Sequence, residues 1–329
     1  MSSLRSARRA TLFTTAAALA GSLLLSGCGS DSGGGTDGAG AQAKTATTRQ
    51  ITDAQGREVT VPAAPKRVVA LSEPTLDAVL ALGVQPVGTT AGRGQKGVST
   101  YLAAKAGQAQ VVASVAEADM EKLAALRPDL ILLDETTGAK KSVDKLQRIA
   151  PTVVTAKLNE EWKKSFTDTA DALDRKAEAE KWLDTFDGDV AATKSALGAN
   201  AGASVSVIRW QDGAPSVVGK GDGVVGSTLG ALGLTRPEEQ QGASTGHSEP
   251  VSLEKLDTVD GDWMFFGTLG DRADGEKAYT EARAVTNFDR LAVEKDGHIV
   301  VVEGSAWNSA GGPLSARIVL DDIKGALAK

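Results

Sequence analysis

Residues 67–83 read RVVALSEPTLDAVLALG, and this stretch joins a strand pattern to a helix pattern. Residues 67–71 form a short apolar run rich in valine, which predicts a buried strand. Residues 74–83 are longer and carry their apolar side chains at helical spacing. A buried strand that leads directly into a helix is typical of an α/β fold.

The same alternation continues toward the C-terminus. Strand patterns lie at 129–134 and 152–156, and a helix pattern lies between them around residues 140–150. Connections of this length between strands imply parallel pairing. Residues 50–157 are therefore predicted to form an N-terminal α/β lobe.

The middle of the chain, residues 158–200, carries no strand signal. Trp182, Phe186 and Val190 recur there at helical spacing, which predicts one or two helices, with Gly188 as a weak point in the pattern. This segment is predicted to leave the first lobe and enter the second.

Residues 201–329 repeat the alternation and are predicted to form a C-terminal α/β lobe, with strand patterns at 205–210, 216–220, 262–268 and 298–304. The motif MEKL at 120–123 is echoed by LEKL at 253–256, and each is followed by an aspartate and an apolar strand. The echo indicates two lobes of similar plan. By residue type alone, the matched acids Glu121 and Glu254 are ordinary solvated charges on helices.

The N-terminus has the layout of an export signal. Residues 1–27 hold three arginines followed by an apolar run at 11–25, which is shorter than the roughly 20 residues that a bilayer span needs. The sequence LSGC that ends at Cys28 resembles the lipobox of bacterial lipoproteins, which implies cleavage before Cys28 and acylation, such as palmitoylation, of its thiol. Residues 28–49 are rich in small and polar residues and are predicted to form a flexible tether. The general secretory and twin-arginine routes both stay open.

Composition excludes several classes of function. The formal net charge is −6, which argues against a nucleic-acid partner. The chain has two histidines and one cysteine, so a transition-metal site made of protein ligands is not expected. Any metal would arrive already wrapped in an organic ligand.

Two motifs suggest enzymes and have simpler interpretations. GDGVVG at 221–226 matches the dinucleotide fingerprint, but a glycine-rich turn before a helix explains it in an exported protein. His247 lies near serines and suggests a secreted hydrolase, yet no G-x-S-x-G elbow is present. We expect no catalytic residue, although the hydrolase and a surface adhesion or sensory module remain alternatives.

Cations and aromatic residues occur where the predicted strands end or in the loops between elements. In open α/β sheets, ligands bind beyond the carboxyl ends of the strands. Flat aromatic faces with a few polar groups suit a medium-sized organic ligand. The candidate ligand-binding residues are Glu73, Arg93, Tyr101, Arg209, Trp210 and Trp307.

Three stretches resemble the bacterial periplasmic-binding proteins of siderophore, haem and cobalamin uptake, the substrate-binding components of ABC importers. They are ITDAQGREVTVPAAPKRVVALSEPTLDAVLALGVQPVG at 51–88, MEKLAALRPDLILL at 120–133 and GGPLSARIVLDDI at 311–323. The resemblance implies two Rossmann-like lobes joined by a long helix, with a ligand cleft between them. It also implies that Glu121 and Glu254 dock on arginines of the permease, although the second copy lacks the proline of the first.

We therefore expect a lipid-anchored, extracytoplasmic monomer that binds a ferric siderophore and delivers it to an ABC permease, whose cytoplasmic ATPase drives release. A hydroxamate siderophore is favoured because the candidate cleft shows few cations. Cobalamin or haem is the alternative ligand. No cofactor and no protein-bound metal are expected. The protein is expected to contact the membrane only through its lipid anchor.

Overall fold

The computed structural model describes residues 47–221, 223–243, 248–308 and 310–328. The predicted signal peptide, Cys28, the tether up to residue 46, and His247 lie outside these residues. No helix in the described part of the chain is long and apolar enough to cross a membrane.

The N-terminal lobe is built on a five-stranded parallel sheet with the strand order β5-β4-β3-β6-β7. Its strands are β3 (Val68–Ala70), β4 (Gly88–Thr90), β5 (Gln110–Ala113), β6 (Leu130–Leu133) and β7 (Thr152–Val154). Between them lie α1 (Glu73–Ala81), α2 (Thr100–Ala106), α3 (Met120–Ala125), the 3-10 helix η1 (Gly138–Ser142) and α4 (Val143–Leu146). A hairpin of β1 (Thr48–Thr52) and β2 (Glu58–Pro62) precedes the sheet and was not predicted.

Both faces of this sheet are buried. Val68 and Ala70 pack into one apolar cluster, whereas Val69 and Leu71 pack into another on the opposite face. Successive side chains of a strand point to opposite faces, so a continuous apolar run is what a sheet covered on both sides requires.

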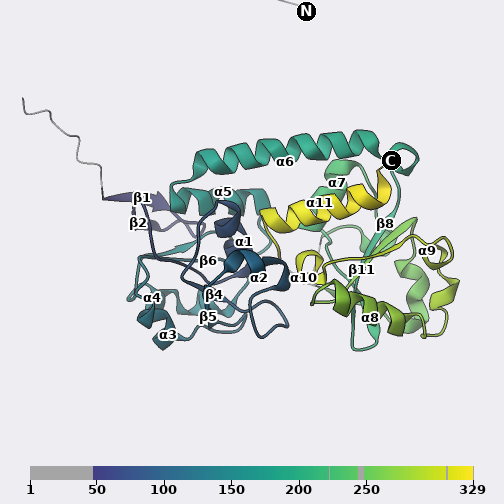
Figure 1. Cartoon of the computed structure of the whole chain (residues 1–329), viewed down its shortest axis with the longest axis horizontal. Helices are drawn as coiled ribbons and strands as arrows, with labels where there is room; N and C mark the ends of the chain where they lie inside the picture. Colours follow the sequence, from purple (N-terminus) through teal and green to yellow (C-terminus); the bar gives the residue numbers. More distant parts are fainter. Residues whose placement is uncertain (1–46, 222, 244–247, 309, 329) are drawn as a thin grey trace, which may run out of the picture. The chain divides into compact units, whose positions relative to one another are not determined.

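Two helices connect the lobes: α5 (Trp162–Leu173) and α6 (Lys176–Ala196). Figure 1 shows α6 running from the first lobe to the second. The chain breaks between them at Asp174, which adopts a left-handed conformation with φ of 57°, and α6 continues through Gly188 without interruption. The helix is thus not interrupted at the predicted weak point, Gly188. A mid-helix glycine costs only about 1 kcal/mol, and burial of Phe186 and Val190 on either side outweighs it.

The C-terminal lobe has a second five-stranded sheet, with the order β10-β9-β8-β11-β12. Its strands are β8 (Val205–Gln211), β9 (Ala214–Val217), β10 (Glu249–Pro250), β11 (Trp263–Gly267) and β12 (Ile299–Val301). Its helices are α7 (Val224–Leu232), α8 (Arg272–Ala282), α9 (Ala292–Lys295), α10 (Gly304–Trp307) and α11 (Pro313–Leu327), with the 3-10 helices η2 (Gly198–Asn200), η3 (Glu238–Gln240), η4 (Leu253–Val259) and η5 (Phe288–Arg290).

This second sheet is mixed. The strands β8, β11 and β12 are parallel, but β9 and β10 run antiparallel to their neighbours. Only Asp212 and Gly213 separate β8 from β9, and both have positive φ, as a tight hairpin turn requires. The predicted helix around residues 252–256 is instead the 3-10 helix η4, which is kinked at Lys255.

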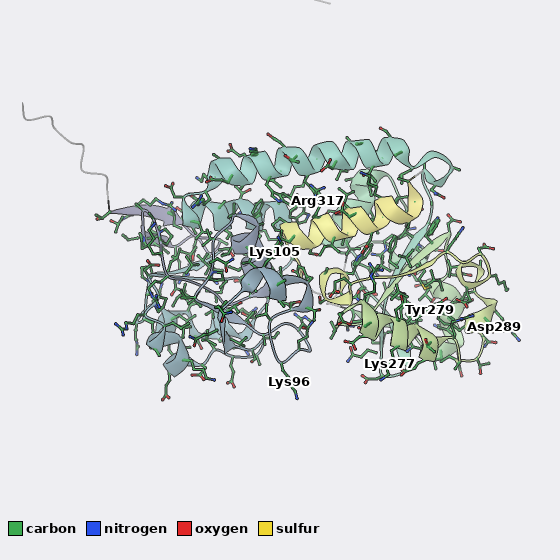
Figure 2. All side chains as sticks on the ribbon, viewed as in Figure 1. Lys96, Lys105, Lys277, Tyr279, Asp289 and Arg317 are labelled. Atoms are coloured by element: carbon green, nitrogen blue, oxygen red, sulfur yellow. The ribbon has the colours of Figure 1, made fainter. Side chains whose placement is uncertain are left out.

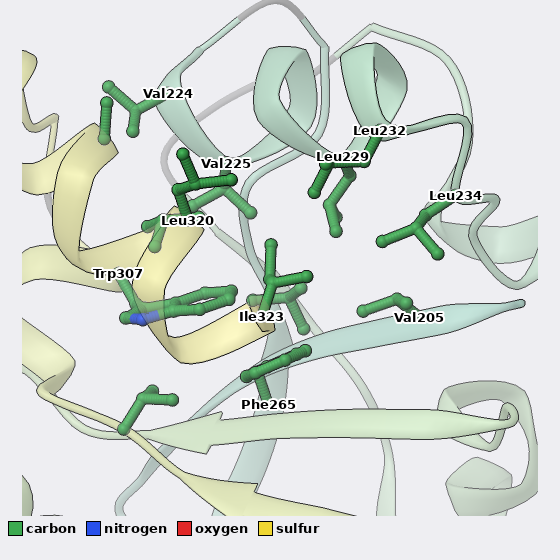
Figure 3. Packing of buried hydrophobic residues seen from close by; sticks show 14 of the residues in the cluster. Val205, Val224, Val225, Leu229, Leu232, Leu234, Phe265, Trp307, Leu320 and Ile323 are labelled. Atoms are coloured by element: carbon green, nitrogen blue, oxygen red, sulfur yellow. The ribbon is translucent and has the colours of Figure 1, made fainter. Parts of the chain in front are cut away.

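Helices α7 and α11 cover one face of the C-terminal sheet. Figure 3 shows Val225 and Leu229 of α7 with Leu320 and Ile323 of α11 above Phe265 of β11. Helix α11 is also tied to α6, because Arg317 forms an ion pair with Asp189 at 2.7 Å, and Figure 2 labels Arg317 beside the long helix. The last helix therefore belongs to the core that joins the lobes.

Candidate functional site

A pocket of about 750 Å³ lies between the two lobes. One wall is formed by the end of β6, the segment after β7 and the start of α5. The other wall is formed by the loop after β9, the start of α7 and the connection from α10 to α11. A volume of this order accommodates a medium-sized organic molecule. Lining residues used below include Asp134, Leu158, Trp162, Lys220, Arg236 and Trp307.

Glycine shapes the C-terminal wall of the pocket. Gly221 has a φ of 72°, and a Cβ on Gly226 would lie 1.9 Å from the carbonyl oxygen of Gly221. In its described residues, the segment that matches the dinucleotide fingerprint is thus a tight turn ahead of α7. The absence of side chains at these positions leaves room for a ligand beside the backbone.

The N-terminal lobe places two buried carboxyl groups near the pocket. Glu73 is 5% exposed and Asp134 is 1% exposed. Burial raises the pKa of both groups. The carboxylate of Asp134 accepts a hydrogen bond from the backbone N–H of Thr136 at 2.8 Å, and Glu73 accepts one from the N–H of Arg93 at 3.2 Å. The charge of Asp134 also raises the pKa of Glu73.

The C-terminal lobe contributes arginines instead. Burial lowers the pKa of Arg209, and the positive charge of Arg93 lowers it further. Arg209 donates to the hydroxyl of Ser248 at 2.6 Å, while its Nε has no hydrogen-bond partner among the described residues. Burial also lowers the pKa of Arg236 to about 10.

Two of the pocket's cations already have partners within the protein. Arg236 donates to the carbonyl oxygen of Val218 at 2.8 Å and to Oε1 of Gln240 at 2.6 Å. Lys220 forms an ion pair with Glu249 at 3.0 Å. These contacts hold the C-terminal wall in place.

The structure brings together some of the predicted ligand-binding residues. Glu73, Arg93 and Arg209 lie near the carboxyl ends of β3, β4 and β8, and the N–H of Arg93 donates to Glu73, but none of the three lines the pocket. Trp307 borders the pocket, but its ring stacks on Phe265 with centroids 4.4 Å apart and is 1% exposed (Figure 3). It therefore belongs largely to the core.

Tyr101 and Trp210 do not line the described pocket. Trp210 is 3% exposed and its ring lies 5.9 Å from that of Phe266, on the sheet face opposite α7 and α11. Because Arg209 and Trp210 are consecutive in β8, their side chains point to opposite faces. The hydroxyl of Tyr101 donates to Oδ2 of Asp77 at 2.8 Å.

Asp77 joins the two lobes and was not predicted from the sequence. Its carboxylate accepts hydrogen bonds from the N–H groups of Leu314 at 2.7 Å and Ser315 at 3.0 Å, at the start of α11. A carboxylate at a helix N-terminus satisfies donors that the helix itself leaves free. Burial nevertheless raises the pKa of Asp77 to about 7. Tyr101 thus completes a contact between α1, α2 and α11, which we term the Asp77 latch.

A second set of hydrogen bonds links the lobes next to this latch. The hydroxyl of Thr100 donates to Glu303 at 2.7 Å, and the N–H of Tyr101 donates to Ser305 at 3.2 Å. The pocket therefore lies between lobes that also contact each other directly.

Glu121 and Glu254 are exposed and occupy equivalent places in the two lobes. Helix α3 precedes β6, the neighbour of β3, and η4 precedes β11, the neighbour of β8. Each acid lies in the first turn of its helix, and the hydroxyl of Ser252 accepts the N–H of Glu254 at 3.3 Å. This geometry puts one exposed carboxylate on each lobe.

The start of α5 is the part of the site that the sequence reading missed. Trp162 packs edge-on against Trp182 and Phe186. It also borders the pocket, and its Nε1 donates to the hydroxyl of Ser227 in α7 at 3.1 Å. Its position at the start of a helix that follows a parallel strand was the available signal.

No cluster of three or more His, Cys, Asp or Glu residues that could hold a metal ion occurs in the described ranges. The site is therefore a pocket lined by apolar side chains, glycines and a few charged side chains, and it is suited to holding an organic ligand.

Comparisons with known proteins agree with this geometry. The family described as "Periplasmic binding protein" matches residues 68–295. The chain is 31% identical over 311 residues to the probable siderophore-binding lipoprotein YfiY of Bacillus subtilis (strain 168), covering 92% of this chain and 93% of that protein. It is 29% identical over 287 residues to the iron(3+)-hydroxamate-binding protein FhuD of the same organism, covering 84% of each chain. The crystal structure of Staphylococcus aureus SirA complexed with staphyloferrin B is similar with a TM-score of 0.71 and 26% identity, covering 85% of this chain and 98% of that one.

Proposed function

The chain belongs to the periplasmic binding protein family, and on that premise we propose that it binds a ferric siderophore between its lobes and hands it to an ABC permease. The observation that carries this proposal is the pocket of about 750 Å³ that both lobes line. Two relatives that match this chain over most of their length, and that are named for siderophore and iron(3+)-hydroxamate binding, support it. The family and these relatives are binding proteins, so the chain is proposed to have no catalytic role.

Among siderophores, a hydroxamate type is favoured. Of the three cationic side chains that border the pocket in the described ranges, Lys220 and Arg236 are engaged with protein oxygens. Few cations therefore remain to balance a strongly anionic catecholate. Iron held by the siderophore's own oxygens needs no protein ligand, which suits a chain with two histidines and one cysteine.

Delivery is proposed to use the two matched acids. Glu121 and Glu254 each expose a carboxylate on a different lobe, and opposite charge on a permease would orient the complex and speed encounter. The cytoplasmic ATPase of the importer would then drive release of the ligand. Acylation of Cys28 after signal cleavage is proposed to hold the monomeric protein on the outer side of the cell membrane.

Tryptophan fluorescence tests the ligand. Trp162 and Trp307 border the pocket, so a bound iron complex lies close enough to quench them. The purified chain should show saturable quenching by ferric hydroxamates and weaker responses to ferric catecholates, haem and cobalamin. Saturation by haem or cobalamin alone would assign the ligand to that class instead, and silence with every ligand would contradict the proposal.

A further inference from the structure

Two large hydrophobic side chains are exposed in the described part of the chain, and one of them faces the pocket. Leu158 is 49% exposed and Leu253 is 37% exposed. Leu158 lines the pocket mouth in the segment after β7, whereas Leu253 lies outside the pocket in η4. An exposed leucine is unremarkable alone, but one set at the edge of a binding pocket calls for an occupant.

The backbone around Leu158 is held in place. The N–H of Leu158 donates to Oε2 of Glu135 at 3.1 Å, and the other oxygen of Glu135 accepts from the side chain of Gln55 at 3.0 Å. The neighbouring N–H of Lys157 donates to Glu160 at 2.9 Å. The hydrogen bonds from Gln55 and Leu158 lower the pKa of Glu135, which favours its ionised form as the acceptor. The leucine is thus presented by a fixed turn.

Apolar side chains continue from Leu158 into the pocket. Trp162 and Phe166 follow it on α5, and Val218 and Val224 border the same pocket from the C-terminal lobe. The latter four side chains are buried, whereas Leu158 retains about half of its surface in water. A ligand that covers Leu158 with an apolar group would remove that surface from water and extend an apolar wall that already exists.

We propose that Leu158 is a specificity-determining residue that packs against an aliphatic arm of the bound chelate. This inference rests on the proposed function and sharpens it: the preferred ligand is a ferric hydroxamate that carries an alkyl chain, rather than a compact chelate. Iron and its oxygen shell would lie deeper, and the alkyl arm would leave the pocket across Leu158.

Two ferric trihydroxamates that differ only in one terminal acyl group, acetyl or hexanoyl, test the proposal with the purified full-length protein. The wild type should bind the hexanoyl chelate about tenfold more tightly, because part of the added chain is buried. L158S should lose most of this preference, with the larger loss of affinity falling on the hexanoyl chelate. The conservative L158M should keep the preference, since a thioether chain still offers apolar surface.

L253S is the matched control, because it removes an exposed leucine outside the pocket. It should leave both affinities unchanged. Equal affinity of the wild type for the two chelates, or an unchanged preference in L158S, overturns the inference while the proposed function stands, because both chelates still bind. Failure of the wild type to bind either chelate removes the proposed function and this inference together.

Discussion

The two lobes share a plan but differ in the charge that they turn toward the pocket. Both sheets have a central strand, β3 or β8, paired on one side with the strand that follows a short helix with a glutamate in its first turn. Near the pocket, the N-terminal lobe buries the carboxyl groups of Glu73 and Asp134, whereas the C-terminal lobe carries the buried Arg209 and the half-buried Arg236. The two lobes thus place their strands and helices alike, but the charged side chains near the pocket differ and decide what each lobe can bind.

The shared plan extends to single hydrogen bonds. Asp129, at the start of β6, accepts the backbone N–H groups of Lys66 and Arg67 at 2.7 and 2.9 Å, next to β3. Asp262, before β11, accepts the N–H of Ser204 at 2.7 Å, next to β8. The same side chain thus pins the same pair of strands in each lobe. This explains why the sequence repeats an aspartate at the same distance after Glu121 and Glu254.

The largest expected effect tests what the lobes share. The double variant Glu121→Ala with Glu254→Ala should bind ligand like the wild type, because both side chains are exposed and outside the pocket. Uptake of radioactive iron as the ferric chelate should fall to background, since each lost charge pair with the permease costs on the order of 2 kcal/mol or more.

A double variant of equally exposed acids on α6 and α8, Glu180→Ala with Glu276→Ala, is the control and should transport normally. Normal uptake by the first double variant would show that the matched acids are ordinary surface charges.

The next effect tests what the lobes do not share. Arg209→Gln should weaken binding of a ferric hydroxamate about thirtyfold, because a charged hydrogen bond contributes about 2 kcal/mol. Asp134→Asn should change affinity less than about threefold, because a carboxylate has no hydrogen-bond donor to offer the oxygen atoms of the chelate. Fluorescence titration measures both, with Arg290→Gln on the distant η5 as the surface control. Equal losses in Arg209→Gln and Asp134→Asn would contradict the charge difference between the lobes.

A smaller effect concerns the Asp77 latch between the lobes. The pKa of Asp77 is raised from 3.8 to about 7 by burial, so the folded protein binds this proton more tightly than the unfolded chain. The stability gained from that proton is complete below about pH 4 and is lost as the pH rises through about 7. An asparagine at this position does not titrate. Its side-chain NH2 group would also lie against the backbone N–H donors of Leu314 and Ser315, which it cannot accept.

Urea unfolding should therefore find the wild type more stable than Asp77→Asn by about 2 kcal/mol at pH 5, and by less at pH 8. Tyr101→Phe keeps the carboxyl and should retain a pH dependence of stability. A stability difference between wild type and Asp77→Asn that grows with pH would show that the carboxyl acts in its ionised form.

The sheet-forming elements could be predicted because their signals are local. The run at 67–71 is apolar on both faces, and the structure buries it on both faces as β3 and its flanks. The antiparallel edge of the second sheet escaped prediction because the Asp212–Gly213 turn is short and was not recognised. Helix α8 was not predicted because its residues 272–282 include few apolar side chains and a glycine.

The site was less predictable, because side-chain direction and long-range contacts decide it. Arg209 was identified by its place at a strand end, but Trp210 beside it points to the other face of the sheet. Asp77 lies within an apolar helix, and its partners are 237 and 238 residues away in the chain. No local pattern shows such a contact.

Native mass spectrometry of the purified protein with a saturating ferric trihydroxamate tests most directly whether iron arrives already chelated. We expect one added mass per chain, equal to the intact siderophore with its iron. Addition of iron without the siderophore would show that the polypeptide itself binds the metal, and no added mass with any ferric siderophore would contradict the account.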